Sequence, residues 1–266
     1  MMEALAALAL LEAMDYDVTA KTYGSMKDII AAAPDYASID TAEDTPMYVC
    51  VGSRRHDASK LPNLTFLPNL DATYRDRDVL LLGDTKGHHQ DMPGEKRIQE
   101  IYEYQGYGAM VIAHDEGGVD LVAAQPGDKI AIPNHCSMTL YNMDTDPLCT
   151  LDFMNPRMNP ANKNVQRRLG PILCVYHAGN EVVFIPNKNY DLGEPIVVPI
   201  GDGTLGAQLH EALGDRRVRS RFAQSGIDCR MATPEVEIGS VRTDMSLLDI
   251  LAREDRLLQR FFGITI

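Results

Sequence analysis

The chain has 266 residues and carries 38 acidic against 25 basic side chains, for a formal net charge of −13 at pH 7. This length suits one large domain, or one domain with substantial extensions. The negative field argues against nucleic acid or an anionic membrane surface as a general partner, because both present phosphates. Five cysteines without a CxxC pair favour buried free thiols in a reducing cytoplasm. No apolar run approaches the roughly 20 residues of a membrane-spanning helix, so a soluble protein is expected.

The first 40 residues predict a helical extension. Residues 1–14 are rich in Ala and Leu, but they lack the basic start of a signal peptide and include Glu3 and Glu12. They therefore predict a helix. Ser25 is the expected N-cap of a second, short helix that ends before Pro34.

Short strand-like runs, separated by Gly, Pro, Asp or Asn, follow from about residue 41 to residue 190. This spacing is typical of an antiparallel sandwich or barrel. We expect 100–104 and 109–113 to form one hairpin. Another is expected at 172–177 and 182–186, where an Ala-Gly-Asn turn tolerates positive φ. The other expected strands are 47–51, 79–82, 119–123, 129–132, 138–141 and 148–153.

Residues 191–266 predict an α/β extension packed on the barrel. A strand at 196–200 precedes a helix at 204–213. The arginine-rich segment 216–221 is typical of a solvated face. A final helix is expected at 246–262, where apolar residues recur at helical spacing.

Candidate site residues lie between residues 83 and 142. Residues two apart on a strand point to the same face, so His88 and Gln90 would look into the barrel while His89 looks out. Glu100 begins the next expected strand, and Met138 lies on a later one. We expect these side chains, apart from His89, to converge inside the barrel.

The same residues make an incomplete set of metal ligands. His88 and Glu100 are good ligands for a divalent ion, whereas Gln90 offers a neutral amide oxygen and Met138 a soft thioether that suits Cu(I). His135 does not repair the set, because it lies three residues from Met138 and so on the other strand face. Two outcomes are open: one divalent metal (Fe, Mn, Ni or Zn) held weakly at these positions, or no metal. The loss of two strong ligands favours the metal-free pocket.

A series of short landmarks runs in order along the chain. They are Met26-Lys-Asp, Asp44-Thr-Pro-Met-Tyr, Thr85-Lys-Gly-His88, Glu100-Ile-Tyr102, Gly106-Tyr-Gly108, Gln125-Pro-Gly and Ile132-Pro. In sequence and approximate spacing they resemble the cupin-type glucose-6-phosphate isomerases of archaea, over about residues 26 to 190. The resemblance implies a mainly β fold, the cupin double-stranded β-helix or jelly roll, here with N- and C-terminal helical extensions. It also implies a homodimer.

The resemblance implies roles for matching residues. In that family an aldose phosphate and a ketose phosphate interconvert through an enediol. Glu100 would move the proton, Tyr102 would contact the sugar, and Thr85 and Gly87 would hold the phosphate. The candidate catalytic residues are Glu100, His88 and Tyr102. The candidate substrate-binding residues are Thr85, Lys86, Gly87 and Tyr104.

The chain also departs from the family pattern. Besides Gln90 and Met138, the segment from Asp152 to Met154 stands where the family tends to place Tyr-Pro. Asp71 falls near the position of an expected phosphate-binding Thr, and an Asp there would repel a phosphate.

Three functions are compatible with this pattern. The first is a sugar-phosphate isomerase-like enzyme that acts on a small polar or anionic metabolite by proton transfer at Glu100. The second is a noncatalytic, metal-free cupin with a binding or regulatory role. The third is a metal-free isomerase, cyclase or lyase whose Met-lined pocket takes a less polar substrate. All three imply a small-molecule ligand or a protein partner in the cytoplasm, without nucleic acid or membrane.

Overall fold

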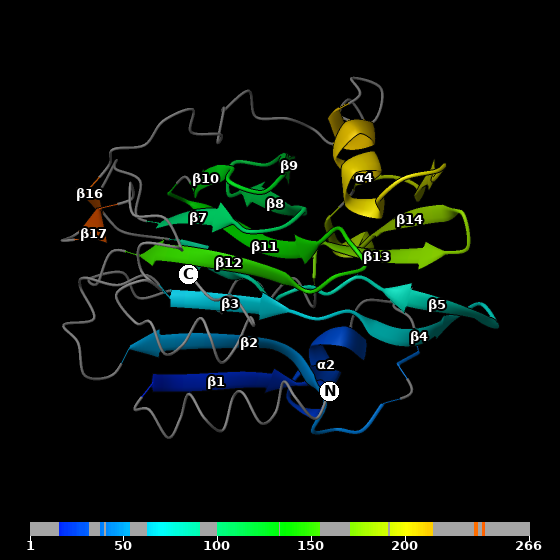
Figure 1. The fold of residues 1–266 in the computed structure, drawn as a ribbon, viewed down its shortest axis with the longest axis horizontal. Helices are drawn as coiled ribbons and strands as arrows, with labels where there is room; N and C mark the ends of the chain where they lie inside the picture. The colour runs from blue at the N-terminus through cyan, green and yellow to red at the C-terminus, as the bar shows by residue number, and fades with distance from the viewer. Residues whose placement is uncertain are drawn as a thin grey trace.

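The structure is a computed structural model that describes residues 16–31, 38–39, 41–53, 63–90, 100–132, 134–154, 171–190, 192–214, 237–238 and 241–242. In these residues the protein is mainly β, with antiparallel sheets of six, four and five strands (Figure 1). The remaining elements are helices α2 (Tyr23–Ala31) and α4 (Leu205–Gly214), the 3-10 helix η1 (Lys188–Tyr190) and a small pair of strands, β16 (Glu237–Ile238) and β17 (Val241–Arg242).

Two of the sheets face each other and form the barrel. One has the strand order β1-β2-β3-β12-β7-β10, and the other has the order β6-β11-β8-β9. Strands β3 and β6 to β12 alternate between the sheets in the manner of a jelly roll, the eight-stranded double Greek key of the cupins. The strands are β1 (Tyr16–Thr22), β2 (Pro46–Ser53), β3 (Asn63–Leu67), β6 (His88–Gln90), β7 (Glu100–Tyr104), β8 (Gly108–His114), β9 (Val119–Ala124), β10 (Lys129–Ile132), β11 (Cys136–Asn142) and β12 (Leu148–Met154).

Side chains from the inner faces of the two sheets form one core. Tyr104 and Ile130 of the six-stranded sheet share a buried cluster with Met110 and Ile112 of the four-stranded sheet. Because successive side chains of a strand alternate, Val111 points to the other face of its sheet and belongs to a second cluster. The inner cluster fills the space between the two sheets.

A third layer, made of one five-stranded sheet, lies beside the barrel and contributes side chains to both clusters. Its strands have the order β15-β14-β13-β5-β4, and α4 lies beside them (Figure 1). Val111 of β8, Val175 of β13 and Leu209 of α4 are fully buried in the second cluster, which joins the layers. The strands of this layer are β4 (Leu70–Tyr74), β5 (Arg77–Leu81), β13 (Leu173–Ala178), β14 (Glu181–Pro186) and β15 (Ile196–Pro199).

Two elements of the later chain match the sequence closely. The hairpin expected at 172–177 and 182–186 is confirmed as β13 and β14, and Gly179 in its turn has a φ of 62°. The helix expected at 204–213 is confirmed as α4. Turn chemistry and helical periodicity are local properties, which explains why both were visible in the sequence.

The hairpin expected between 100–104 and 109–113 is wrong. Strand β7 pairs with β10 and β12, whereas β8 pairs with β9 and β11 in the other sheet. Both strands are buried along their whole length. Strand β7 takes both of its partners from distant segments, whereas β8 forms a hairpin with β9 and pairs with the more distant β11 on its other side. The chain therefore crosses from one sheet to the other after Tyr104, as a jelly roll requires.

The start of the chain is less helical than expected. Residues 16–22 form strand β1, which pairs along its length with β2 at the edge of the six-stranded sheet. Helix α2 begins at Tyr23, and its first turn is capped by Thr22 rather than Ser25, since the Ser25 N–H donates to Thr22 Oγ1 at 3.3 Å. Residues 16–22 form a strand because they pair with β2. Such long-range pairing leaves little trace in the local sequence pattern.

Some expectations fall on residues that the structure does not describe. These are the helix at 1–14, the arginine-rich segment 216–221 and the helix at 246–262. The division into an N-terminal extension, a barrel at 41–190 and a C-terminal extension stays a prediction, as does the homodimer. None of the described helices is long and apolar enough to cross a membrane.

The segment from Gly83 to Gly87 is fastened to β11. Thr85 N–H donates to Leu140 O at 3.0 Å, and Leu140 N–H donates back to Thr85 Oγ1 at 3.1 Å. Gly87 has a φ of 65° and lies so close to the Met138 carbonyl that a Cβ would collide with it. These contacts extend the β6 pairing along β11 and hold the segment as a fixed wall.

We expect Gly87→Ala to destabilise the protein more than Gly179→Ala. Both glycines have left-handed backbone, so each alanine carries a similar strain of about 1 kcal/mol. Only at Gly87 does the new Cβ meet a neighbour, and we expect this overlap to cost a further ~2 kcal/mol. Urea unfolding of both variants measures the difference. Equal losses would show that the segment is not held against β11.

Candidate functional site

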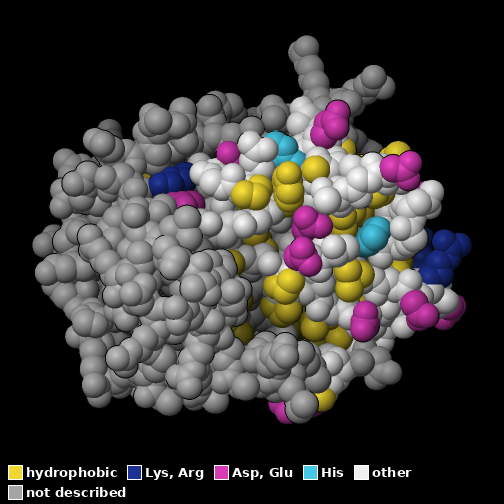
Figure 2. All heavy atoms as spheres, in the orientation of Figure 1, with side chains coloured by type: hydrophobic (Ala, Val, Ile, Leu, Met, Phe, Trp, Pro, Cys, Tyr) yellow, Lys and Arg dark blue, Asp and Glu magenta, His cyan; other side chains and the backbone are white. Residues whose placement is uncertain are grey.

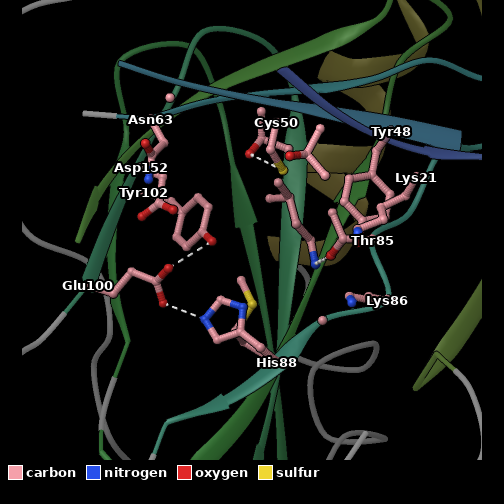
Figure 3. A pocket seen from close by; sticks show the side chains of 16 residues that line it. Lys21, Tyr48, Cys50, Asn63, Thr85, Lys86, His88, Glu100, Tyr102 and Asp152 are labelled. Atoms are coloured by element: carbon pink, nitrogen blue, oxygen red, sulfur yellow. Dashed lines mark hydrogen bonds and ion pairs between the residues drawn. The ribbon is translucent and has the colours of Figure 1, made fainter. Parts of the chain in front are cut away.

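A pocket of about 410 Å³ opens between the two barrel sheets, at the side where β1 and β2 extend the six-stranded sheet. In Figure 3, Glu100, Tyr102 and Asp152 lie on one side of the pocket and Lys21, Tyr48, Thr85 and Lys86 on the other, with His88 between them. The pocket therefore has an acidic side and a cationic side.

His88 and Glu100 meet from opposite sheets. His88 begins β6 and Glu100 begins β7, and His88 Nε2 lies 2.8 Å from Glu100 Oε2 (Figure 3). The Glu100 side chain is completely buried. The structure thus brings together the two residues that the sequence offered as the strongest metal ligands, but it joins them directly by a hydrogen bond.

Tyr102 makes a second hydrogen bond to the Glu100 carboxylate. It lies two residues further along β7, on the same face, and its hydroxyl donates to Glu100 Oε1 at 2.9 Å. Both oxygens of Glu100 therefore accept a hydrogen bond from a buried side chain. Tyr102 lines the pocket, and its catalytic role stays a prediction.

Asp152 also belongs to the site. From the sequence it was noted only because it departs from the family pattern. It lies on β12 directly opposite Tyr102 and lines the pocket. Its carboxyl group is close enough to Glu100 to influence the pKa of that side chain, and its Oδ1 has no hydrogen-bond partner among the described residues. The signal that could have found it is the strand alternation, which puts Asp152 on the inward face with Thr150.

The ionic states in this cluster are set by burial and by pairing. Burial alone would raise the pKa of Glu100, but the His88 charge, with hydrogen bonds from His88, Asp152 and Tyr102, holds the pKa below its ordinary value. Burial alone would lower the pKa of His88, but Glu100 raises it above its ordinary value. Each group therefore stabilises the charged form of the other.

The pKa of Asp152 is shifted in the opposite direction to that of Glu100. Burial raises its pKa well above the ordinary value, and the nearby Glu100 charge raises it further. Two carboxyl groups so close in a buried site do not both ionise readily. Asp152 is therefore the group that keeps its proton, and it can donate a hydrogen bond to Glu100.

The remaining candidate ligands do not complete a metal site. Met138 lines the pocket as the cross-strand partner of His88 and is 1% exposed. The backbone of Gln90 pairs with Cys136, and the structure does not describe the Gln90 side chain. Among the described residues no group of three or more His, Cys, Asp or Glu side chains could hold a metal ion, whereas catalytic zinc usually has three protein ligands. The described donors do not fit the divalent metal that the family resemblance implies.

The two histidines outside the inward face lie away from the pocket. His89 is buried and its Nε2 lies 3.0 Å from both carboxylate oxygens of Asp115. His135 is exposed in a turn with a φ of 59°. Neither lines the pocket.

Three of the four candidate substrate-binding residues line the pocket. Thr85, Lys86 and Gly87 do so from the segment held against β11. Tyr104 does not: it is fully buried in the inner core, and its hydroxyl has no hydrogen-bond partner among the described residues. Asp71 does not line the pocket either. It is exposed on β4 of the third layer, so its charge does not face a ligand in the pocket.

The sequence missed the contribution of β1 and β2. Lys21 on β1 and Tyr48 on β2 are cross-strand partners and line the cationic side of the pocket. Cys50 lines it too, with Sγ 3.6 Å from Thr65 Oγ1. Reading residues 16–22 as a strand would have suggested Thr19 and Lys21 as neighbours on one face.

We expect Asp152→Asn to gain stability relative to the wild type as the pH rises. A carboxyl whose pKa is raised in the folded state contributes stability below its unfolded pKa of 3.8, and this is lost as the pH rises through the folded pKa. Asparagine has a similar shape and does not titrate. Between pH 4 and pH 8 the difference in unfolding free energy should move in favour of the variant by about 1 kcal/mol or more.

Urea unfolding at several pH values measures this difference. Asp71→Asn, at an exposed position away from the pocket, is the control. A difference between Asp152→Asn and the wild type that stays constant with pH would contradict the raised pKa of Asp152.

Comparison with known proteins gives matches only among solved structures. No protein-family profile matches the chain, and neither does any curated protein. The Drosophila melanogaster CENP-C cupin domain aligns at 10% identity over 57% of this chain and 96% of that one, with a TM-score of 0.31. Another structure of Drosophila CENP-C is matched over 63% of its length.

Two oxalate enzymes align over shorter parts of their chains. Bacillus subtilis oxalate decarboxylase aligns at 15% identity over 47% of this chain and 30% of that one, with a TM-score of 0.31. A recombinant oxalate oxidase in complex with glycolate aligns at 10% identity over 52% and 49%, with a TM-score of 0.26. Likeness at this level concerns the fold alone, and the relation to glucose-6-phosphate isomerases stays a prediction from the residues. By its strand order and sheet pairing, the protein has the mainly β jelly roll of the cupins.

Proposed function

We propose that this protein is an enzyme of the sugar-phosphate isomerase type, which acts on a small polar or anionic metabolite by moving a proton at Glu100. The observation that carries the proposal is the His88–Glu100–Tyr102 network in the wall of the 410 Å³ pocket. A carboxylate beside a cavity can accept a proton from a carbon next to a carbonyl group.

The network supplies the parts of such a proton transfer. Glu100 is ionised, so it can accept a proton from one carbon and return it to the neighbouring carbon. His88 gives a proton to the carbonyl oxygen and takes one back from the neighbouring hydroxyl, which completes an aldose–ketose isomerisation. The hydrogen bonds that Glu100 accepts lower its basicity. A substrate that takes over the Tyr102 hydroxyl or the His88 N–H as a donor to its own oxygens would restore that basicity and stabilise an enediolate.

This chemistry does not call on a metal ion. In the described residues the positive charge next to Glu100 comes from His88, and the neutral donors are Tyr102 and Asp152. Isomerisation of glucose 6-phosphate and fructose 6-phosphate is the specific reaction that the residue resemblance suggests. A cyclase or lyase reaction that begins with the same proton abstraction would use the same residues.

A noncatalytic binding or regulatory role is the second candidate. It is favoured by the complete pairing of Glu100, whose two oxygens already accept hydrogen bonds, and by the burial of Met138 at a ligand position. In that case the network would only support a ligand pocket. The two candidates differ in whether Glu100 exchanges a proton with the ligand.

We expect Glu100→Gln to abolish proton transfer while the protein stays folded. Wild-type protein is incubated in D₂O with fructose 6-phosphate and glucose 6-phosphate, and both isomerisation and deuterium incorporation are followed by NMR. Loss of a general base should lower the rate by at least about 100-fold. Glutamine keeps the size of the side chain and can still accept from Tyr102.

Glu103→Gln is the matched control for this experiment. Glu103 lies on the same strand, pairs with Lys129 at 3.0 Å and does not line the pocket. The control should keep the wild-type rate. If the wild type neither interconverts the two sugar phosphates nor incorporates deuterium into them, sugar-phosphate isomerisation is excluded and the binding role gains support.

We expect the double variant Gln90→His with Met138→His to bind divalent metal more tightly than the wild type. With His88 and Glu100 it would present three imidazoles and one carboxylate, a set that suits Mn²⁺ or Zn²⁺. Calorimetric titration with each ion should show an affinity at least about tenfold higher. Affinity equal to the wild type would mean that these four side chains do not converge.

A further inference from the structure

The cationic side of the pocket is formed by two lysines from different parts of the chain. Lys21 lies on β1, at the edge beyond the eight jelly-roll strands, and Lys86 lies in the segment between β5 and β6. Both line the pocket, on the side opposite Glu100 and Asp152 (Figure 3). Lys21 reaches this place because β1 pairs with β2 in a register that sets it opposite Tyr48.

Neither of these two lysines has a carboxylate partner among the residues that the structure describes, which distinguishes them from Lys27 and Lys129. Lys27 pairs with Glu43 at 3.1 Å and Lys129 pairs with Glu103 at 3.0 Å. No such ion pair joins Lys21 or Lys86 to any residue in the described part of the chain. The nearest acidic groups of the pocket are already engaged, since Glu100 is bonded to His88 and Tyr102.

The two charges also act on each other and on the groups between them. Burial lowers the pKa of Lys86, and the Lys21 charge lowers it further. Burial raises the pKa of the Cys50 thiol, while Lys21 and Lys86 both oppose that rise. Two like charges facing one cavity repel each other, and an anion placed between them removes this repulsion.

The cationic side contrasts with the rest of the molecule. The chain has a net charge of −13, and acidic side chains are scattered over the described surface in Figure 2. Such a surface does not attract anions. A pair of unpaired lysines inside a pocket of this protein is therefore a local feature that needs its own explanation.

We propose that Lys21 and Lys86 form a subsite for the oxyanion group of the ligand, and that Lys21 determines the specificity for that group. The inference rests on the proposed function for the identity of the pocket and adds the part of the ligand that is recognised there. The oxyanion is a phosphate or a carboxylate. Thr85, whose Oγ1 accepts from Leu140 N–H, retains a hydroxyl proton that it can donate to the same group.

The test is calorimetric titration of the full chain with inorganic phosphate and, separately, with succinate, at constant ionic strength. We expect the wild type to bind at least one of them, and Lys21→Met to weaken that binding by about tenfold or more, as for loss of one charge-assisted hydrogen bond. Lys86→Met should weaken it as well. Binding of phosphate alone identifies a phosphate group, and binding of succinate identifies a carboxylate.

Two controls separate the subsite from general electrostatics and from folding. Lys27→Met removes the same charge from an exposed lysine outside the pocket and should leave the affinity unchanged. Lys21→Arg keeps the charge and should restore most of the affinity. The inference is overturned if Lys21→Met binds like the wild type, if Lys27→Met weakens binding equally, or if the wild type binds neither anion.

Failure of this inference is distinguishable from failure of the proposed function. Glu100→Gln should keep the affinity for the anion while losing proton transfer, because Glu100 lies on the other side of the pocket (Figure 3). Anion binding that depends on Lys21, without proton transfer in the wild type, would support the subsite and reject the enzyme. Proton transfer without any effect of Lys21 on binding would do the reverse.

Discussion

The Glu100 carboxylate is the group on which the arrangement of the site depends. It is completely buried, and an ionised carboxylate without partners would be very unfavourable there. His88 supplies a positive charge from the opposite sheet, and Tyr102 and Asp152 supply hydrogen bonds from the same sheet. Two sheets must therefore keep a fixed separation and register for Glu100 to remain ionised. The charge state of the site therefore depends on the packing of the barrel.

The closed barrel also explains how a pocket can persist beside such a cluster. The inner core around Tyr104 and Met110 fills the barrel on one side of Glu100, while β1 and β2 extend the sheet on the other and leave a cavity. The third layer and α4 bury the back of the four-stranded sheet. Strand β11, which holds the segment from Gly83 to Gly87, is thereby packed on both faces and forms a rigid support for that pocket wall.

The pocket has charge on both of its sides, and this separation limits what it can bind well. A ligand with an oxyanion at one end and an exchangeable proton at the other would match Lys21 and Lys86 on one side and Glu100 on the other. A uniformly apolar ligand would leave these groups without compensation. The metal-free reactions considered from the sequence are therefore best matched by polar substrates, even though Met138 lies in the lining.

The sequence by itself determined the features that depend on local periodicity. Strand alternation put His88 on a different face from His89 and put Glu100 on the same face as Tyr102, and turn and helix signals located β13, β14 and α4. It did not determine which strands pair, because hydrogen bonding between distant segments leaves no local pattern. For this reason β7 and β8 were expected as a hairpin, residues 16–22 as part of a helical region, and Lys21 and Asp152 were not assigned to the site. Only the tertiary structure could place β12 beside β7 and bring β1 and β2 to the same pocket, and so decide the charge on each side of that pocket.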